Sequence, residues 1–235
     1  MNGQPEIELL QAEVDENDES YFRVLVDDLF IKYITVEPGL YSSEDMCFGP
    51  SLVSLLPKFP PGDWNDGRVA KNPKDGRPHF AHVSLTRFSG VQNTWHETFV
   101  DYSDLVVGRK LRTGIYEVRS SSFHDIVIAK FARFPWEIQY IETETTAYQW
   151  IVGHDIGPQF LGHLTENGRV IGLLLERITD SRHAGAQDLE ICAEATLIDF
   201  DTAQKCDNRE LLSQELENLR ICLEDSSGRG GGGLL

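Results

Sequence analysis

The chain has 235 residues, of which 40% are hydrophobic and 25% are charged, and this composition is that of a globular protein rather than a disordered one. Its formal net charge of −17 argues against a surface for nucleic acids or anionic membranes, because phosphate groups are bound by clustered Lys and Arg. The first residues, MNGQPEIELL, carry no secretory signal pattern, and no apolar run approaches the roughly 20 residues that a membrane span needs.

Cysteine and histidine give no sign of a disulfide framework or a zinc site. The four cysteines lie far apart, without C-x-x-C spacing, and the seven histidines form no H-E-x-x-H motif. Reduced thiols of this kind are typical of cytoplasmic or nuclear proteins, and we expect one of these two locations.

Residues 1–105 are predicted to form an N-terminal β-rich region. Its strand-like runs are residues 21–26, 30–36, 51–56, 80–85 and 98–102. Residues 57–78 are rich in proline and glycine, which predicts a long ordered loop or an inter-strand connection, with Trp64 as a packing anchor.

The middle of the chain predicts strands followed by a helix. Residues 104–118 alternate as two strands around a turn, and residues 126–131 (IVIAKF) form a strand in which Lys130 shares a face with Ile128. A helix over residues 136–152 follows Pro135, a residue favoured at helix starts.

Glu144 falls within the apolar stripe of this helix, between Ile141 and Tyr148 at 100° per residue. A carboxylate on a buried helix face costs several kcal/mol unless a cation or hydrogen-bond donors meet it, and Lys130 on the preceding strand is a candidate. Spacing alone favours the alternative, in which Glu144 lies at the edge of the stripe and reaches solvent.

The helix is followed by a predicted hairpin. Residues 159–164 and 169–176 are strand-like, and Asn167-Gly168 between them is the strongest short hairpin signal. Residues 196–198 form a short apolar strand that ends at Asp199. A final helix over residues 208–223 carries a leucine stripe that indicates packing within the protein, since two heptads are too few for a zipper.

This order of elements resembles that of a protein-kinase-like domain. The amino-acid sequence itself resembles a group of fungal kinase-like proteins related to aminoglycoside phosphotransferases. The resemblance rests on PPGDWNDG (60–67), IAKFARFPWEIQYIETET (128–145), GPQFLGHLTENGRVIGLLLERI (157–178) and TLIDFDTAQKC (196–206). With their flanks these stretches cover most of residues 55–210.

The resemblance implies a role for each matching residue. Lys130 matches the strand lysine that pairs the α- and β-phosphates of ATP, and Glu144 matches the helix glutamate that holds it. Glu176 and Ile178 match the hinge, where the backbone meets adenine. Asp199 matches the Asp of D-F-G that binds Mg²⁺.

Two departures from the family pattern weaken this assignment. The usual G-x-G-x-x-G is absent, since only Gly108 and Gly114 flank RKLRT. Only twenty residues (179–198) separate hinge and metal Asp, and they contain no His-x-Asp catalytic loop. A skipped exon, a mis-spliced gene model and a degenerate relative are each compatible with this gap.

The expected fold is therefore α+β, with a β-rich region (1–105), a kinase-like N-lobe with an antiparallel sheet and a helix (106–178), a truncated C-lobe (179–225) and a flexible Gly-rich tail (226–235). We interpret the chain as a catalytically impaired kinase-fold protein, or a truncated isoform of an active phosphotransferase, with weak or lost binding of ATP and Mg²⁺. The alternative is a non-enzymatic protein-interaction module with an unidentified protein partner. A glycoside hydrolase is a remote third interpretation, because no acid and nucleophile pair is recognisable.

Overall fold

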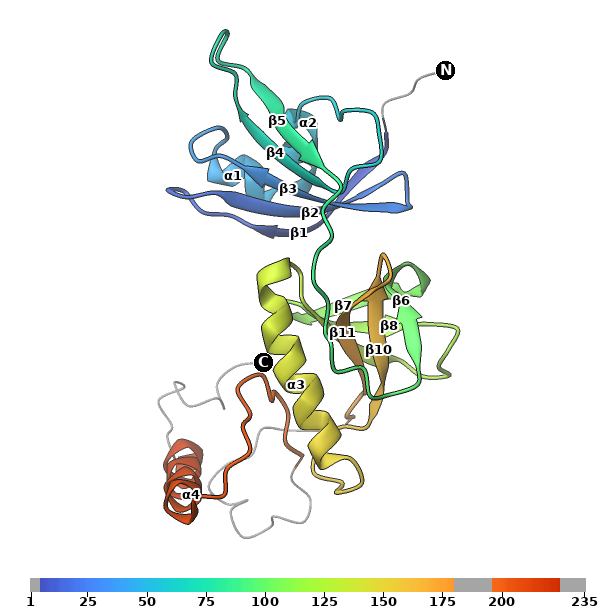
Figure 1. The fold of residues 1–235 in the computed structure, drawn as a ribbon, viewed down its shortest axis with the longest axis vertical. Helices are drawn as coiled ribbons and strands as arrows, with labels where there is room; N and C mark the ends of the chain where they lie inside the picture. The colour runs from blue at the N-terminus through green and yellow to red at the C-terminus, as the bar shows by residue number, and fades with distance from the viewer. Residues whose placement is uncertain (1–4, 180–195, 225–235) are drawn as a thin grey trace. The chain divides into compact units, whose positions relative to one another are not determined.

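The computed structural model describes residues 5–179 and 196–224, and the chain divides into two compact units, Met1–Ser89 and Gly90–Leu235 (Figure 1). Each unit is built around one mixed β-sheet and helices are few, which confirms the predicted α+β class. The division falls after Ser89 rather than at residue 105, because strand β6 (Phe99–Asp101) pairs with β10 of the second sheet.

The first unit contains a five-stranded sheet in which neighbouring strands follow chain order. Strands β3 and β4 are parallel, the other pairs are antiparallel, and the connection between β3 and β4 contains two short helices. The elements are β1 (Ile7–Glu13), β2 (Ser20–Val26), β3 (Phe30–Val36), α1 (Ser43–Cys47), α2 (Gly49–Leu55), β4 (Asp66–Lys71) and β5 (Pro78–Ser84).

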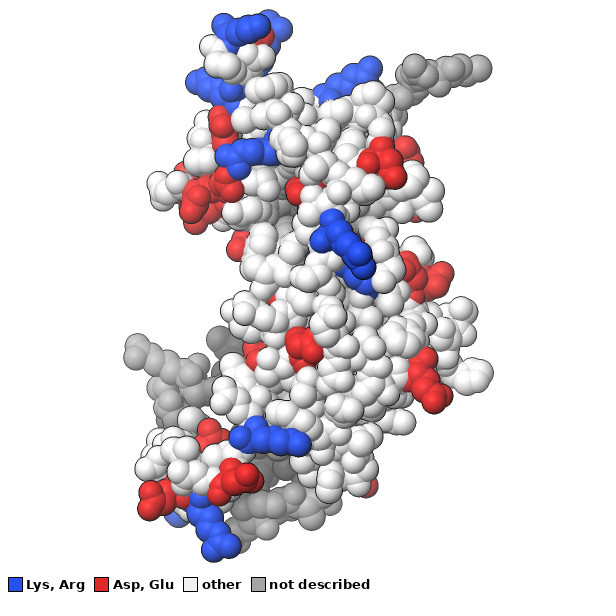
Figure 2. Space-filling view, viewed as in Figure 1, with Lys and Arg blue, Asp and Glu red and all other residues white. Residues whose placement is uncertain are grey.

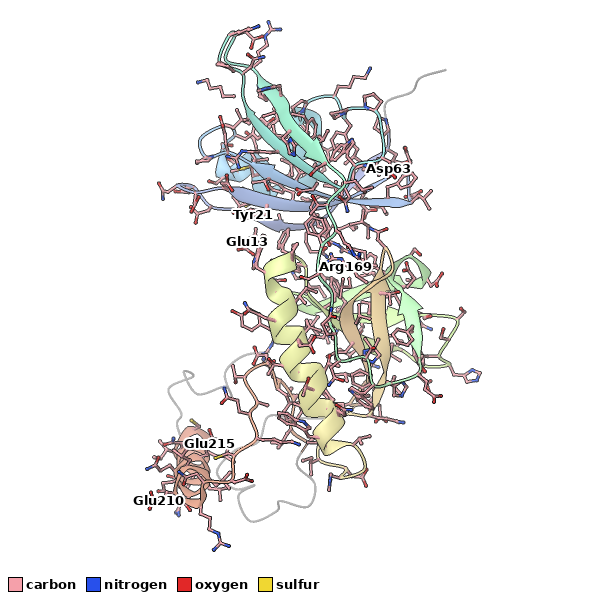
Figure 3. The ribbon with its side chains drawn as sticks, in the orientation of Figure 1. Glu13, Tyr21, Asp63, Arg169, Glu210 and Glu215 are labelled. Atoms are coloured by element: carbon pink, nitrogen blue, oxygen red, sulfur yellow. The ribbon has the colours of Figure 1, made fainter. Side chains whose placement is uncertain are left out.

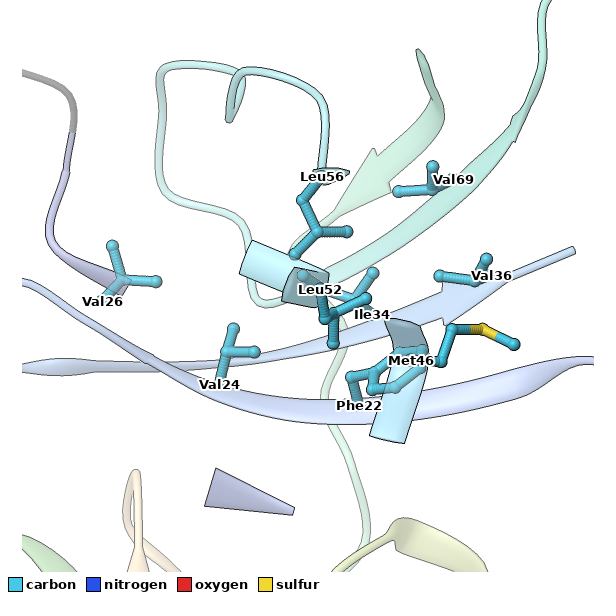
Figure 4. Close-up of a cluster of buried hydrophobic side chains, with 9 residues drawn as sticks. All are labelled: Phe22, Val24, Val26, Ile34, Val36, Met46, Leu52, Leu56 and Val69. Carbon is cyan, nitrogen blue, oxygen red and sulfur yellow. The ribbon is translucent and has the colours of Figure 1, made fainter. Parts of the chain in front are cut away.

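The core of this unit lies between one face of the sheet and the two helices (Figure 4). Alternate residues of a strand point to the same face, so β2 supplies Phe22, Val24 and Val26 to the core and β3 supplies Ile34 and Val36. The nine buried members are Phe22, Val24, Val26, Ile34, Val36, Met46, Leu52, Leu56 and Val69.

Two predictions for this unit are wrong. Residues 51–56 do not form a strand: they belong largely to α2, because a short apolar run fits a helix as well as a strand, and here Leu52 and Leu56 are buried four residues apart. The predicted loop over residues 57–78 contains β4. Trp64 is buried, as expected, and its ring lies 5.3 Å from that of Phe80.

The second unit contains a six-stranded sheet in the order β6-β10-β11-β9-β8-β7. Strands β6 and β10 are parallel and the remaining pairs are antiparallel. The strands besides β6 are β7 (Val106–Arg112), β8 (Ile115–Arg119), β9 (Val127–Phe131), β10 (Phe160–Glu166) and β11 (Arg169–Glu176).

Helices of this unit connect or follow the strands. Helix α3 (Ile138–Ile151) lies between β9 and β10 in the chain and packs against β11, with the 3₁₀ turns η1 (Tyr102–Asp104) and η2 (Pro135–Glu137) before it. The predicted hairpin is confirmed: Asn167 and Gly168 join β10 to β11 with φ of 50° and 77°.

The predictions for the chain after β11 are confirmed only in part. Residues 196–198 form no strand and follow an irregular path. Within the predicted C-lobe (179–225), residues 180–195 and 225 lie outside the described residues, as does the whole predicted tail (226–235). Helix α4 (Arg209–Glu224), which carries Glu210 and Glu215 (Figure 3), forms as predicted, but its Leu212, Leu216 and Leu219 are exposed instead of packed.

Charge and hydropathy of the surface agree with the composition. Figure 2 shows acidic and basic side chains interspersed on the face in view, without a large patch of one sign. Within residues 5–179 and 196–224, no helix is long and apolar enough to cross a membrane.

Candidate functional site

Strand β9 places Lys130 in the interior of the second sheet, between β8 and β11. In the two ladders Lys130 lies opposite Ile115 and Leu173. Its neighbours Ala129 and Phe131 are buried on the other side of the strand, so the alternation turns the lysine to the opposite face. Only 15% of the Lys130 side chain is exposed.

Helix α3 brings Glu144 to this lysine. The helix follows the 3₁₀ turn that starts at Pro135, where the Glu137 carboxylate accepts a hydrogen bond from the backbone N–H of Arg133 at 2.6 Å. Its inner face buries Ile141, Tyr148 and, with 1% of its side chain exposed, Glu144. The solvent-facing alternative for Glu144 is therefore wrong.

Lys130 Nζ lies 2.7 Å from Glu144 Oε2. This distance is that of a close ion pair. A buried carboxylate needs such a cation, because an unpaired charge in the interior is strongly unfavourable.

Asp199 completes the group from the other side. Its Oδ1 lies 2.5 Å from Lys130 Nζ, although the two residues are far apart in the chain, and half of the Asp199 side chain is exposed. With φ of 74°, Asp199 adopts the left-handed backbone conformation, which is uncommon for a residue with a side chain and is concentrated at functional sites.

The irregular segment around Asp199 is held by contacts with α3 and the turn that follows it. The Leu197 N–H donates to the Ile156 carbonyl at 2.7 Å, and the Phe200 ring meets Tyr148 edge-on at 5.2 Å. Farther along, Lys205 lies over the Trp150 ring, 4.9 Å from its centroid. These contacts position Asp199 without any strand at residues 196–198.

The three charged groups perturb one another. Burial disfavours the charged form of Lys130, but Glu144 and Asp199 together outweigh it and raise the pKa of the ammonium. Burial raises the pKa of Glu144; Lys130 opposes this rise, while Asp199 and Asp201 add to it. The group is therefore a protonated lysine shared by two carboxylates.

The predicted hinge residues lie at the end of β11. Glu176 pairs with Val127, and its N–H donates to the Gln159 carbonyl at 2.9 Å. Glu176 and Ile178 are both exposed, and among the described residues neither makes a hydrogen bond or ion pair with Lys130, Glu144 or Asp199. The structure thus brings three of the five predicted residues together and leaves these two apart.

Sequence reasoning missed a charged cluster beside the end of β11. Glu117 on β8 pairs with Arg177 at 2.9 Å and with Arg109 on β7 at 3.2 Å. The hydrogen bond from Arg109 is the largest influence on the pKa of the Glu117 carboxyl, and with the charges of Arg109 and Arg177 it outweighs the opposing effect of burial and lowers that pKa. The signal in the sequence was the opposite charge of Arg109 and Glu117, eight residues apart across the β7–β8 turn. It could have predicted the Arg109–Glu117 pair but not the pair with Arg177.

The donor set permits Mg²⁺ only with help from a ligand. The described residues contain no group of three or more His, Cys, Asp or Glu that could hold a metal. Mg²⁺ bound with a nucleotide commonly uses one or two carboxylates, phosphate oxygens and water, and the half-exposed Asp199 fits that requirement.

Comparison with known proteins adds nothing to this geometry. No family model matches the chain, and no curated protein matches it.

Proposed function

We propose that the second unit is the small lobe of a protein-kinase-like fold that binds a nucleoside triphosphate with Mg²⁺ but does not transfer phosphate. The observation that carries this proposal is the position of Lys130, 2.7 Å from Glu144 and 2.5 Å from Asp199. In protein kinases a strand lysine, a helix glutamate and a metal-binding aspartate are the groups that must be in place to hold the phosphates.

The connectivity of the second unit supports the same proposal. A hairpin (β7–β8) leads into the lysine strand β9, then the glutamate helix α3, then a second hairpin (β10–β11) whose last strand returns beside β9. This is the running order of the kinase small lobe that the sequence resembles. The hinge would then follow β11, at Glu176 and Ile178.

The residues present fit the phosphate end of a nucleotide in a limited way. Lys130 supplies a positive charge held at the sheet, and Asp199 supplies an exposed carboxylate for Mg²⁺. Because Lys130 is already paired with Asp199, bound phosphate has to compete with that contact, and we expect weak binding. Mg-ATP, when bound, supplies the phosphate oxygens that complete the metal shell.

Phosphoryl transfer is not expected because its catalytic loop is missing from the sequence. No His-x-Asp occurs between Ile178 and Asp199, so there is neither a base to orient a hydroxyl nor the accompanying Asn for a second metal. Where catalytic groups act as a unit, loss of one key member already costs about as much as loss of all of them.

One observation favours a second candidate, a non-enzymatic interaction module. The charge of Lys130 is already met by two carboxylates, so the group is complete as a structural ion-pair network without any ligand. In this case Lys130, Glu144 and Asp199 hold α3 on the sheet and nothing binds there.

Thermal unfolding of the full chain with and without millimolar Mg-ATP distinguishes the two. A ligand that binds only the folded state raises the free energy of unfolding by RT ln(1 + [L]/Kd), so Tm rises, and we expect a shift of several degrees. Asp199→Asn should abolish the dependence on Mg²⁺ while leaving the Lys130–Glu144 pair intact, and Lys110→Met on exposed β7 is the matched control. No shift in the unaltered chain would reject nucleotide binding and leave the interaction module.

A further inference from the structure

Residues 90–96, which we call the strap, join the end of the first unit to β6 and lie against both α3 and the β10–β11 hairpin (Figure 1). They form neither helix nor strand. Their order comes instead from hydrogen bonds to side chains and backbone of those elements. None of these contacts involves Lys130, Glu144 or Asp199 directly.

The strongest contact is made by Glu142, two residues before Glu144. One oxygen of its carboxylate accepts the backbone N–H of Gln92 at 2.5 Å, and the other accepts that of Asn93 at 3.0 Å. Hydrogen bonds to an ionised acceptor are about twice as strong as those between neutral groups. Two consecutive backbone donors on one carboxylate also fix its direction, and hence the rotation of the helix that carries it.

Further contacts hold α3 on the other side of Glu144. Asn93 Nδ2 donates to Thr146 Oγ1 at 3.0 Å and to Gln149 Oε1 at 2.9 Å. Trp95 Nε1 donates to the Thr145 carbonyl at 2.9 Å. The helix is thus held at positions before and after the buried glutamate.

The strap is itself fixed to the sheet. The Val91 N–H donates to the Val170 carbonyl of β11 at 2.9 Å, and the Val91 side chain is buried. At its other end, the His96 N–H donates to Nε2 of buried His163 on β10 at 3.2 Å. Since the sheet also carries Lys130, the strap connects α3 to the same framework that holds the lysine.

We infer that the strap sets the distance between Lys130 and Glu144, with Glu142 and Asn93 as positioning residues. A helix rises 1.5 Å and turns 100° per residue, so a small slip or rotation of α3 carries the Glu144 carboxylate away from the ammonium. The strap's consequence for nucleotide affinity rests on the proposed function, whereas its effect on the ion pair does not.

The test measures the ion pair directly, in the full chain and without nucleotide. Lysines are acylated with an N-hydroxysuccinimide ester, and the rate at Lys130 is followed by mass spectrometry with exposed Lys110 as the internal reference. Glu142→Ala removes two hydrogen bonds to a carboxylate, and we expect Lys130 to react at least about tenfold faster, the ratio that corresponds to one hydrogen bond to a charged group. Asn93→Ala removes two hydrogen bonds between neutral side chains, and we expect a smaller rise of about fivefold. Gln139→Ala, at an exposed position on the same helix away from the strap, should leave the rate unchanged.

A conservative variant separates positioning from general loosening. Glu142→Gln keeps one acceptor oxygen, so its Lys130 rate should fall between those of the unaltered chain and Glu142→Ala. If Glu142→Ala loses its cooperative melt, Asn93→Ala decides, because it removes only two contacts between side chains. An unchanged Lys130 rate in folded Glu142→Ala or, failing that, in Asn93→Ala overturns the inference. If Lys130 is acylated faster in these variants but Mg-ATP does not shift the Tm of the unaltered chain, the positioning role of the strap is supported. In that case only the proposed nucleotide binding is rejected.

Discussion

The carboxylate of Glu144 lies 2.7 Å from the ammonium of Lys130, almost completely shielded from solvent by α3 and the sheet beneath it. Two charged groups in this setting are mutually dependent. Desolvation of each is costly, and only the partner and nearby polar groups offset it, so removal of one leaves the other as an uncompensated buried charge. The pair therefore makes stability of the second unit sensitive to a single substitution.

Lys130→Met tests this dependence. We expect the free energy of unfolding to fall by about 3–5 kcal/mol, the usual cost of breaking a buried ion pair by removing one partner. The cost arises at Glu144, which is left as an unpaired buried carboxylate, whereas Asp199 is half-exposed and can be solvated. Urea denaturation at pH 7, followed by tryptophan fluorescence, measures the change.

The double variant Lys130→Met with Glu144→Gln is the control for that cost. It removes both charges, so its loss of stability should be clearly smaller than the sum of the two single losses. In Lys130→Met alone, the lysine no longer opposes the effect of burial, so the pKa of Glu144 rises further. A raised carboxyl pKa favours the folded state as pH falls, so the deficit should shrink at pH 4–5. Additive losses that do not change with pH would contradict a coupled pair.

His163 makes the stability of the second unit depend on pH. It is fully buried, and this burial, with a smaller contribution from His96, lowers its pKa from 6.5 to about 4. Between pH 6.5 and about 4, His163 is protonated in the unfolded chain but stays neutral in the folded chain. Stability should therefore fall as pH drops from about 6.5 to about 4, by roughly 3 kcal/mol for this one group.

Unfolding free energies measured at intervals from pH 7 to pH 4 test this assignment. His163→Phe cannot be protonated, and its stability should fall by roughly 3 kcal/mol less over that range than that of the unaltered chain. His124→Asn, at an exposed position, is the matched control and should retain the full pH dependence. An identical slope in His163→Phe would mean that another group is responsible.

Local patterns predicted much of the second unit. Alternation predicted the lysine strand, Asn167-Gly168 predicted the hairpin, and the 3.6-residue period placed Glu144 beside Tyr148. The burial of Glu144 was not decided by the period, because a residue within an apolar stripe can still turn its carboxylate outward. The tertiary partner decides, and that partner comes from a different strand.

Contacts across long sequence separations could not be predicted from local patterns. The contact between Asp199 and Lys130 depends on an irregular segment that was expected to be a strand, and that segment is held by single contacts such as Phe200 with Tyr148. Glu142 and Asn93 carry no local signal for their hydrogen bond. In the first unit, residues 51–56 fitted a strand and a helix equally, and packing under the sheet selected the helix.

Gly172 on β11 allows the close approach that places Lys130. A Cβ at this position would lie 2.5 Å from the Lys130 carbonyl oxygen and 2.6 Å from Phe131 Cβ, far inside van der Waals contact. Gly172→Ala should therefore push β11 and β9 apart and lower stability by about 1–3 kcal/mol, the range for overpacked cores.

The acylation rate of Lys130 provides the local readout for Gly172→Ala and should rise, because the strand that carries the lysine is displaced. Gly49→Ala is the matched control, since a Cβ there meets only Leu9 at an ordinary 3.4 Å. Equal, small effects of the two substitutions would show that the sheet relaxes around a methyl group at Gly172.

The same substitution at two leucines separates a packed helix from an exposed one. Leu52 of α2 is fully buried in the core of the first unit, and Leu52→Ala should cost about 2–5 kcal/mol through lost burial and the cavity that remains. Leu216 of α4 is 69% exposed, and Leu216→Ala should change stability by no more than about 0.5 kcal/mol, since Ala and Leu are both good helix formers. Urea denaturation measures both. A cost well above 1 kcal/mol at Leu216 would mean that the leucine stripe of α4 is packed in solution, as its period first suggested.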